Sequence, residues 1–194
     1  MKKMGFILLA LLITAPVLAD EPDVLFGGKV KHGVFFAPVL KISQQGDNIG
    51  IMTGSRCGWI LNHSYMIGVG SYQLIGKINI DPDLIDLPDS YDMNYSGLEL
   101  EYIRSSNRLL HYSIYSLLGA GLLNYVDDDF YLYGAEDVFF VFEPGVNVTL
   151  NLHKYIRVNL LTSYRMVADV DLEGLSNKDL NGVNATLTLS FGWF

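Results

Sequence analysis

The last twelve residues of the chain alternate between apolar and small polar side chains. From residue 183 to residue 193 every second position is apolar, and the positions between them carry Asn, Thr, Ser or Gly before the chain ends on Phe194. A period of two is that of a β-strand, whose successive side chains point to opposite faces of a sheet. The pattern predicts a strand with one apolar and one polar face. An alternating strand of this length is typical of one that crosses a bilayer.

Seven earlier segments alternate in the same way, and the clearest of them runs from residue 138 to residue 151. Its apolar positions 138, 140, 142, 146, 148 and 150 alternate with polar or small residues at 143, 145, 147, 149 and 151. The predicted strands cover residues 29–42, 49–61, 65–77, 94–104, 110–126, 138–151, 155–167 and 183–194. With 12 Tyr, 10 Phe and 19 Gly, the composition also favours strands over a helical bundle.

The links between these strands differ in length. Residues 62–64, 105–109 and 152–154 make short links, residues 78–93, 127–137 and 168–182 make long ones, and 43–48 is intermediate. Strict alternation of long and short links is typical of a membrane barrel, in which the short turns face the periplasm. We therefore predict an all-β fold, an eight-stranded antiparallel up-and-down transmembrane β-barrel with periplasmic termini. Pro38 and Pro144 lie inside predicted strands, where each removes a ladder donor; a β-bulge at each would absorb it, and the sequence leaves open whether one forms.

The amino terminus has the pattern of an export signal. Lys2 and Lys3 precede an apolar run, and Val17 and Ala19 occupy the small-residue positions before a cleavage site. We expect residues 1–19 to be a signal peptide cleaved near Ala19, and residues 20–194 to form the barrel. Loss of the two lysines changes the formal charge from −8 to −10, so nucleic acid is not an expected partner. Cys57 is the only cysteine, which excludes an intramolecular disulfide, and it lies on the apolar face of its strand.

Export signal, strand count, loop lengths and the final Phe194 together resemble the small outer-membrane β-barrels of Gram-negative bacteria. This group contains OmpX-like, OmpW-like and OmpA-type membrane domains. The resemblance implies an outer-membrane location, contact with outer-membrane lipid and lipopolysaccharide, and recognition of the C-terminal strand by the barrel assembly machinery. Such barrels end with apolar residues at the last, third-last and fifth-last positions. Here those positions are Phe194, Gly192 and Ser190, and a bulge near Gly192 would restore the pattern.

Six charged residues lie on the predicted inward faces, three of each sign. They are Arg56, Glu99, Glu101, Glu143, Arg157 and Arg165. Since an eight-stranded barrel is just wide enough to be filled by side chains, we expect a salt-bridged interior that closes the bore. A proton or ion path, or acid–base chemistry by Glu99 and Glu101, is the alternative. His111 and Ser113 share an inward face, but no catalytic residue, cofactor or metal ligand is assigned.

The long links carry acidic and aromatic residues that form a candidate interaction surface. Its residues are Asp127, Asp128, Asp129, Phe130, Tyr131 and Tyr133. Acidic links of this kind are suited to weak binding of a divalent cation, although the spacing is not that of an EF-hand.

Three functions follow from these patterns. The first is a non-enzymatic outer-membrane protein with a structural or surface-interaction role through its extracellular loops. The second is a narrow channel or transporter for small apolar molecules or ions, for which inward-facing glycines would leave room. These glycines are Gly50, Gly54, Gly58, Gly68, Gly70, Gly119 and Gly121. The third is a soluble, exported ligand-binding barrel of lipocalin type.

Overall fold

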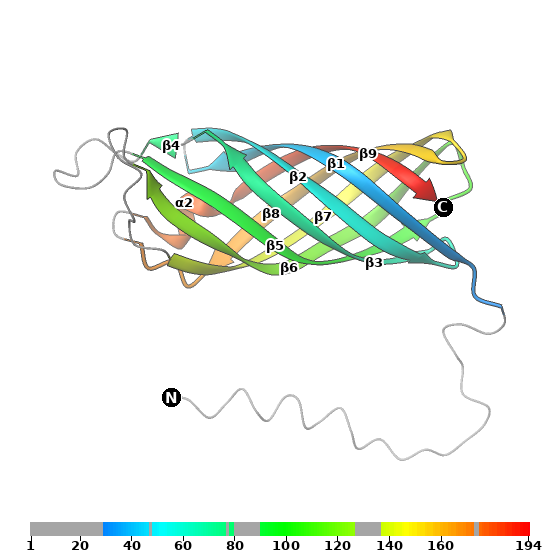
Figure 1. The fold of residues 1–194 in the computed structure, drawn as a ribbon, viewed down its shortest axis with the longest axis horizontal. Coiled ribbons are helices and arrows are strands. Elements are labelled where there is room, and N and C mark those ends of the chain that lie inside the picture. The colour runs from blue at the N-terminus through cyan, green and yellow to red at the C-terminus, as the bar shows by residue number, and fades with distance from the viewer. Residues whose placement is uncertain (1–28, 47, 77, 80–89, 127–136, 173–174) are drawn as a thin grey trace, which may run out of the picture. The chain divides into compact units, whose positions relative to one another are not determined.

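The computed structural model describes residues 29–46, 48–76, 78–79, 90–126, 137–172 and 175–194. The expected signal peptide and the acidic and aromatic surface at 127–133 lie outside the described residues. Eight long strands form the barrel (Figure 1). They are β1 (His32–Gln45), β2 (Asn48–Leu61), β3 (Tyr65–Ile75), β5 (Ser90–Arg104), β6 (Leu110–Val126), β7 (Asp137–His153), β8 (Ile156–Ala168) and β9 (Gly182–Trp193).

Each long strand pairs antiparallel with the next long strand along the chain, and the pairing of the first with the last closes the sheet. β1 pairs with β9, and β3 pairs with β5. The short strand β4 (Ile78–Asn79) pairs with the start of β5 beyond the end of β3. The predicted eight-stranded up-and-down barrel is therefore confirmed, and no long strand is left with a free edge.

The two faces of the wall have opposite chemistry. Outward-facing Phe36, Leu118 and Trp193 are 55%, 65% and 65% exposed, whereas inward-facing Lys41, Thr186 and Arg165 are fully buried. A barrel in water would bury its apolar face, because removing apolar surface from water is the main force that drives folding. The reversed arrangement is that of a wall facing lipid, and it argues against the lipocalin-type alternative.

Aromatic side chains gather on the outer face near one end of the barrel. His32 stacks on Trp59 with ring centroids 5.3 Å apart, and Tyr155 meets Trp193 edge to face at 6.4 Å. A band of this kind marks the level of the lipid headgroups in membrane barrels. In the part of the chain that the structure describes, none of the helices has the length and apolarity needed to cross a membrane.

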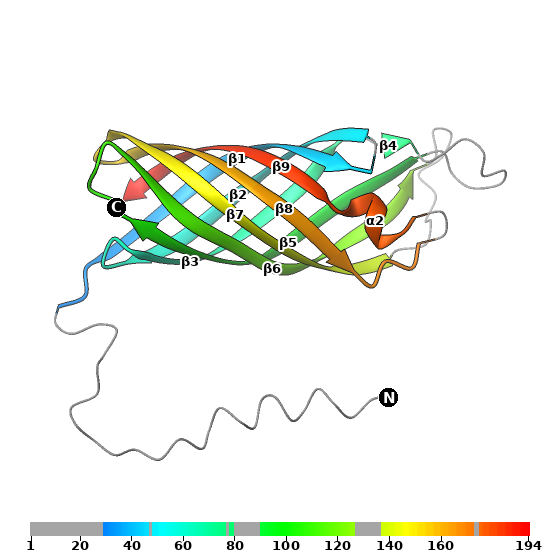
Figure 2. The ribbon, with the colours of Figure 1, turned by 180° about the vertical axis from the view of Figure 1, so that it is seen from behind.

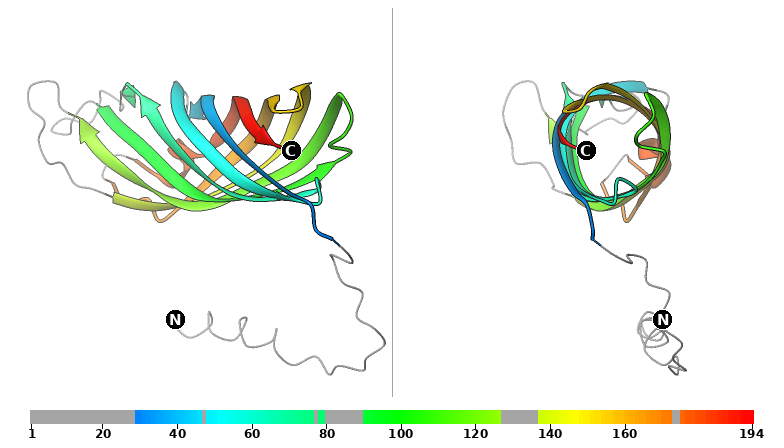
Figure 3. Two further views of the ribbon diagram at one scale, coloured as in Figure 1. Left: turned by 45° about the vertical axis from the view of Figure 1, so that its right-hand side comes forward. Right: turned by 90° about the vertical axis from the view of Figure 1, so that its right-hand side faces the viewer.

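The two ends of the barrel differ. The turns at residues 62–64, 105–109 and 154–155 and the C-terminus share one end, here called the short-turn end (Figures 1 and 3). At the other end β6 ends, β7 begins, and the helix α2 (Asn177–Leu180) lies between β8 and β9 in the chain (Figure 2). The expected strict alternation of link lengths is wrong at one place. β1 ends at Gln45 and β2 begins at Asn48, so a tight turn containing Gly46 at φ +56° joins them.

The two prolines are accommodated without β-bulges. Pro38 faces Ser55 in the β1–β2 ladder, and the β1–β9 ladder is interrupted beside it but resumes in the same register. Pro144 interrupts the β7–β8 ladder in the same way, and the register is again unchanged. A gap in one ladder suffices because proline lacks only its own N–H. The β1–β9 pairing also runs without a shift through Gly192, so no bulge there restores the C-terminal pattern of apolar residues.

Candidate functional site

The inward faces carry a polar interior that crosses the bore. The structure places all six predicted interior charges on these faces, from strands β2, β5, β7 and β8. They do not combine as three pairs. Of the six, the three carboxylates and Arg56 are in ion pairs, and the other two arginines have no carboxylate within 4.0 Å among the described residues.

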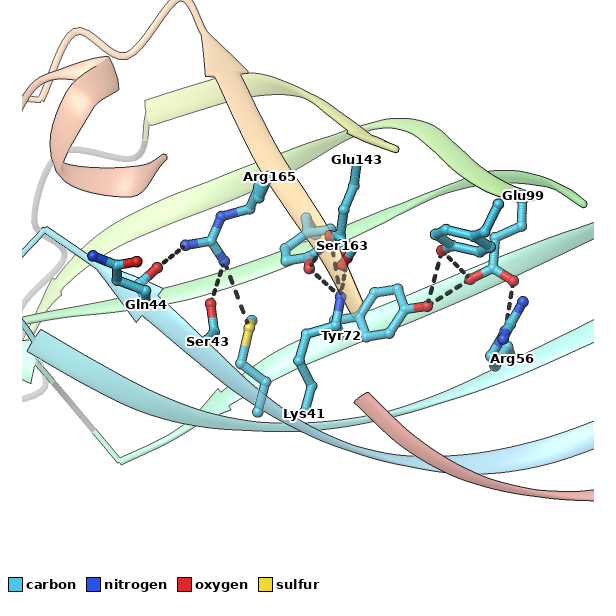
Figure 4. Close-up of polar contacts among 12 residues, drawn as sticks. Lys41, Ser43, Gln44, Arg56, Tyr72, Glu99, Glu143, Ser163 and Arg165 are labelled. Carbon is cyan, nitrogen blue, oxygen red and sulfur yellow. Dashed lines mark hydrogen bonds and ion pairs between the residues drawn. The ribbon is translucent and has the colours of Figure 1, made fainter. Parts of the chain in front are cut away.

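The first cluster surrounds Glu143 on β7. Lys41 Nζ on β1 lies 2.8 Å from Glu143 Oε1, and neither side chain is exposed. Tyr95 donates to Glu143 Oε2 at 2.8 Å, and Ser163 donates to Oε1 at 2.5 Å. One carboxylate thus joins four strands (Figure 4). Such a buried pair is favourable only when hydrogen bonds also satisfy its other polar atoms.

Lys41 was not among the predicted interior charges, although its residue type and position were visible in the sequence. It lies on the inward face of the first strand, four residues after the buried Ala37. The sequence did not show which charged residue would pair with Glu143. Glu143 meets a lysine 102 residues away, and none of the predicted arginines.

The second cluster surrounds Arg56 on β2. Its Nε lies 2.7 Å from Glu99 Oε2, and its Nη2 lies 3.3 Å from Glu101 Oε2. Tyr72 and Tyr115 donate to Glu99 Oε1 at 2.5 and 3.0 Å. The two glutamates therefore share one guanidinium, and the Glu99 carboxylate also accepts from two phenols. This saturation does not suit the acid–base alternative, which requires a carboxyl group free to exchange a proton with a substrate.

Aromatic rings join the two clusters. Tyr72 and Tyr95 stack with centroids 5.1 Å apart, and Lys41 Nζ lies 3.9 Å from the centre of the Tyr72 ring. A cation over an aromatic face is attracted by the negative charge density of the ring. Toward the end opposite the short-turn end, apolar side chains continue the filling. They include Met52, Met93, Leu123 and Phe139, each with an exposed fraction of 0%.

The inward glycines give space to neighbouring side chains. A Cβ added at Gly70 would overlap Glu99 and Tyr72, and one at Gly121 would overlap Phe139. The room that these glycines leave is therefore already occupied. They allow large side chains to pack across a narrow bore.

The two remaining arginines lie near opposite ends. Arg165 donates to the carbonyl oxygens of Leu180 at 2.8 Å and Gln44 at 3.1 Å, and to Ser43 Oγ at 2.9 Å. It holds α2 and the end of β1 against the barrel mouth (Figure 4). Arg157 lies near the short-turn end, where its guanidinium carbon is 4.0 Å from the Phe194 ring centre.

His111 and Ser113 do not form a nucleophile and base. Ser113 donates to Glu101, and Nδ1 of His111 lies 3.3 Å from the carbonyl oxygen of Arg108. Each side chain is therefore engaged with a different group. Cys57 is exposed on the outer face, opposite Phe36 in the β1–β2 ladder.

No protein-family model matches the chain, and no curated protein matches it. Several solved structures are similar to it. The N-terminal β-barrel domain of Pseudomonas aeruginosa OprF aligns with a TM-score of 0.58 at 10% identity, over 85% of this chain and 100% of that one. Neisserial surface protein A aligns with a TM-score of 0.53 at 10% identity, over 86% and 99%.

A third similar structure is Ail, the attachment invasion locus protein of Yersinia pestis, solved in complex with the heparin analogue sucrose octasulfate. It aligns with a TM-score of 0.50 at 14% identity, over 84% of this chain and 97% of that one. Identities this low show the fold and not the activity. The resemblance inferred from the sequence is confirmed at that level: the chain has the fold of the small eight-stranded outer-membrane β-barrels.

Proposed function

We propose that this protein is an exported, non-enzymatic outer-membrane barrel with a closed bore, which acts in envelope integrity or surface contact through the links opposite the short-turn end. The observation that carries the proposal is the filled interior. The Lys41–Glu143 and Arg56–Glu99 pairs, joined by the Tyr72 and Tyr95 rings, occupy the bore between the two ends. An ion passing through would have to displace buried, hydrogen-bonded charges, which is costly in a medium of low dielectric constant.

The outer surface supports a membrane location. The exposed aliphatic and aromatic face, the aromatic side chains near the short-turn end and the fold likeness all favour an outer-membrane wall. In this orientation the short turns and both ends of the barrel chain face the periplasm. The outward residues Leu189, Phe191 and Trp193 of β9 then offer an apolar C-terminal strand to the assembly machinery.

At the opposite end, side-chain contacts fix α2 against the barrel beside the ends of the strands that the links join. Arg165 ties α2 to the barrel mouth, and the buried Leu172 and Leu180 add apolar contacts there. We expect the acidic and aromatic residues 127–133, which begin beyond the end of β6, to contact lipopolysaccharide or another surface partner. Aromatic side chains are favoured in such contacts because they bury a large area at little entropic cost.

Two measurements test the location and the closed bore separately. The protein in membrane fractions is run boiled and unboiled on a denaturing gel, and we expect a faster unboiled band in the outer-membrane fraction. Purified protein is then inserted into planar bilayers, where we expect no steady unitary current. A soluble periplasmic protein with unchanged mobility would overturn the location. Steady currents in samples free of porin would overturn the closed bore and favour the channel alternative.

A third measurement tests the role of the loops. A strain lacking the protein is complemented with the wild-type chain or with a chain whose residues 127–133 are replaced by Gly and Ser. We expect both proteins to show the heat-dependent mobility shift, and only the wild type to restore resistance to entry of a hydrophobic dye. Equal restoration by both chains would contradict a role for this surface.

A further inference from the structure

A hollow of about 730 Å³ opens at the short-turn end of the barrel. It is lined by residues from three separate turns, including Asn62, Asn107 and Lys154, together with Arg157 and Phe194. Figure 3 (right) shows this end along the barrel axis, with the turns and the C-terminus around the ring. The volume is within the range of small-molecule sites, roughly 300–1,000 Å³. We call this hollow the vestibule.

The charged side chains of the vestibule are of one sign. Its lining contains Lys31, Lys154 and Arg157, with His63 and His153 beside them. No Asp or Glu side chain is among its described lining residues, and the others are mostly Asn and Ser. This contrasts with the net charge of −8 for the chain as a whole. The backbone carboxylate of Phe194, the last residue of the chain, is a negative group at the same lining, but the positive side chains outnumber it. A concave site with an excess of positive charge attracts anions.

Arg157 forms the floor of the vestibule and lacks an ionic partner. It is 8% exposed, and among the described residues no carboxylate lies within 4.0 Å of it. Within the described ranges its hydrogen bond runs from Nη2 to the Ser106 carbonyl oxygen at 3.4 Å, and its guanidinium carbon lies 4.0 Å from the centre of the Phe194 ring. A guanidinium has five N–H donors in a planar fork that matches phosphate and carboxylate oxygens. Arg56 is buried to a similar degree but pairs with two carboxylates.

Burying a cation that no carboxylate contacts raises the free energy of the folded protein, and a bound anion would lower it again. Arg157 also lines a cavity of about 30 Å³ directly inside the vestibule, together with Asn159, Ser190 and Glu101. The Glu101 carboxylate pairs with Arg56 and lies more than 4.0 Å from Arg157, so it offsets the charge of Arg157 only in part. The free donors of Arg157 therefore lie where the vestibule meets the interior. The surrounding amides and hydroxyls supply hydrogen bonds suited to a polyhydroxylated ligand.

We propose that the vestibule binds a small soluble sugar that carries a phosphate or carboxylate group. The anionic group is held by Arg157 at the floor and by Lys154 at the rim. The hydroxyl groups of the sugar bind the amide side chains of Asn62 and Asn107. A lipid headgroup is a poorer fit, because the vestibule lies within the ring of strands, whereas the lipid-facing residues of the same region, such as Trp193, lie on the outside. This inference does not depend on the function proposed for the links.

The test uses the full mature chain, folded in a detergent of zero net charge and labelled with ¹⁵N. Glucose 6-phosphate is the probe, and glucose is the neutral match. We expect saturable amide shifts at residues 62–64, 105–107 and 151–154 with glucose 6-phosphate in the millimolar range, and none with glucose. The affinity should fall as salt rises, since salt screens the charges at the open rim.

Single substitutions test which side chains contact the bound sugar phosphate. Lys154→Ala removes an exposed turn residue and should weaken binding about threefold, the usual size for a solvent-exposed ion contact. Arg157→Gln should weaken it about tenfold or more, because it removes charge-assisted hydrogen bonds. Lys178→Ala is the matched control, since Lys178 is an exposed lysine in α2 at the other end. The heat-dependent gel shift shows which variants fold, and Lys154→Ala carries the test if Arg157→Gln does not fold.

Three outcomes would overturn the proposal. The first is the absence of saturable shifts with glucose 6-phosphate. The second is equal weakening by Lys154→Ala and Lys178→Ala, which would show that general charge attraction explains the binding. The third is equally tight binding of inorganic phosphate at the same residues, which would show that the sugar hydroxyls are not recognised and that the site holds an adventitious ion only.

Discussion

Lys41 and Glu143 meet inside the barrel with Nζ 2.8 Å from Oε1, although 102 residues separate them in the chain. The two strands that carry them, β1 and β7, are not neighbours in the sheet. The pair therefore holds opposite parts of the wall together through the bore. It also explains how a narrow barrel can contain these two full charges, because they balance each other within the interior.

The Lys41→Met substitution should destabilise the barrel by about 3–5 kcal/mol, since it leaves the Glu143 carboxylate buried without a cation. Urea unfolding in lipid vesicles, followed by tryptophan fluorescence, measures the change. The double variant Lys41→Met with Glu143→Gln should regain much of the loss because it removes both charges. A double variant no more stable than Lys41→Met would mean that the ionic pairing is not what Lys41 contributes.

The Arg165→Gln substitution should loosen the segment around α2 while the barrel stays folded. Arg165 donates to Leu180, Ser43 and Gln44, and hydrogen bonds of charged groups contribute about 1.5–3 kcal/mol. We expect chymotrypsin to cleave near Leu172 and Leu175 about tenfold faster or more, with the heat-dependent gel shift retained. Arg104→Gln, an exposed arginine near the short-turn end, is the control and should leave the cleavage rate unchanged. Unchanged cleavage in Arg165→Gln would contradict the anchoring role.

The Gly70→Ala substitution should lower the free energy of unfolding by about 1–3 kcal/mol, the usual cost of extra volume in a packed core. The added methyl group would overlap Glu99 and Tyr72, which occupy the space over this glycine. Ser71→Ala on the adjacent outward position should change stability by less than about 0.5 kcal/mol. A Gly70→Ala variant as stable as wild type would indicate an interior with spare room, as a channel requires.

A fluorophore on Cys57 should report a lipid environment. The protein is labelled with a bimane maleimide while unfolded in urea, and is then refolded into vesicles. Because Cys57 is exposed on the outer apolar face, brominated lipids should quench the emission and aqueous iodide should not. Cys57→Ser protein treated in the same way corrects for unspecific labelling. Quenching by iodide alone would show that Cys57 is exposed to water, and it would contradict the conclusion that the outer face of the barrel contacts lipid.

Local sequence patterns predicted most of the barrel. Alternation with a period of two placed the eight long strands and assigned the faces of Leu118, Glu143 and Trp193 correctly, because a strand that separates lipid from a polar interior must alternate. Alternation does not indicate how a turn is built, where a short helix forms or whether strand register shifts, and these features were not predicted correctly. The turn at Gly46, the position of α2 and the unshifted ladders beside Pro38 and Pro144 depend on pairing partners far away in the chain.

The sequence by itself determined the all-β class, the strand order and which charges face inward, since these follow from short-range periodicity. Only the tertiary structure decided the partners of those charges. In the structure Glu143 pairs with Lys41, and Glu99 and Glu101 both pair with Arg56. Arg157, at the floor of the vestibule, has no carboxylate within 4.0 Å among the described residues. Pairing depends on the register of eight strands around a closed ring, and a shift of one residue in any strand would turn its charges to the other face.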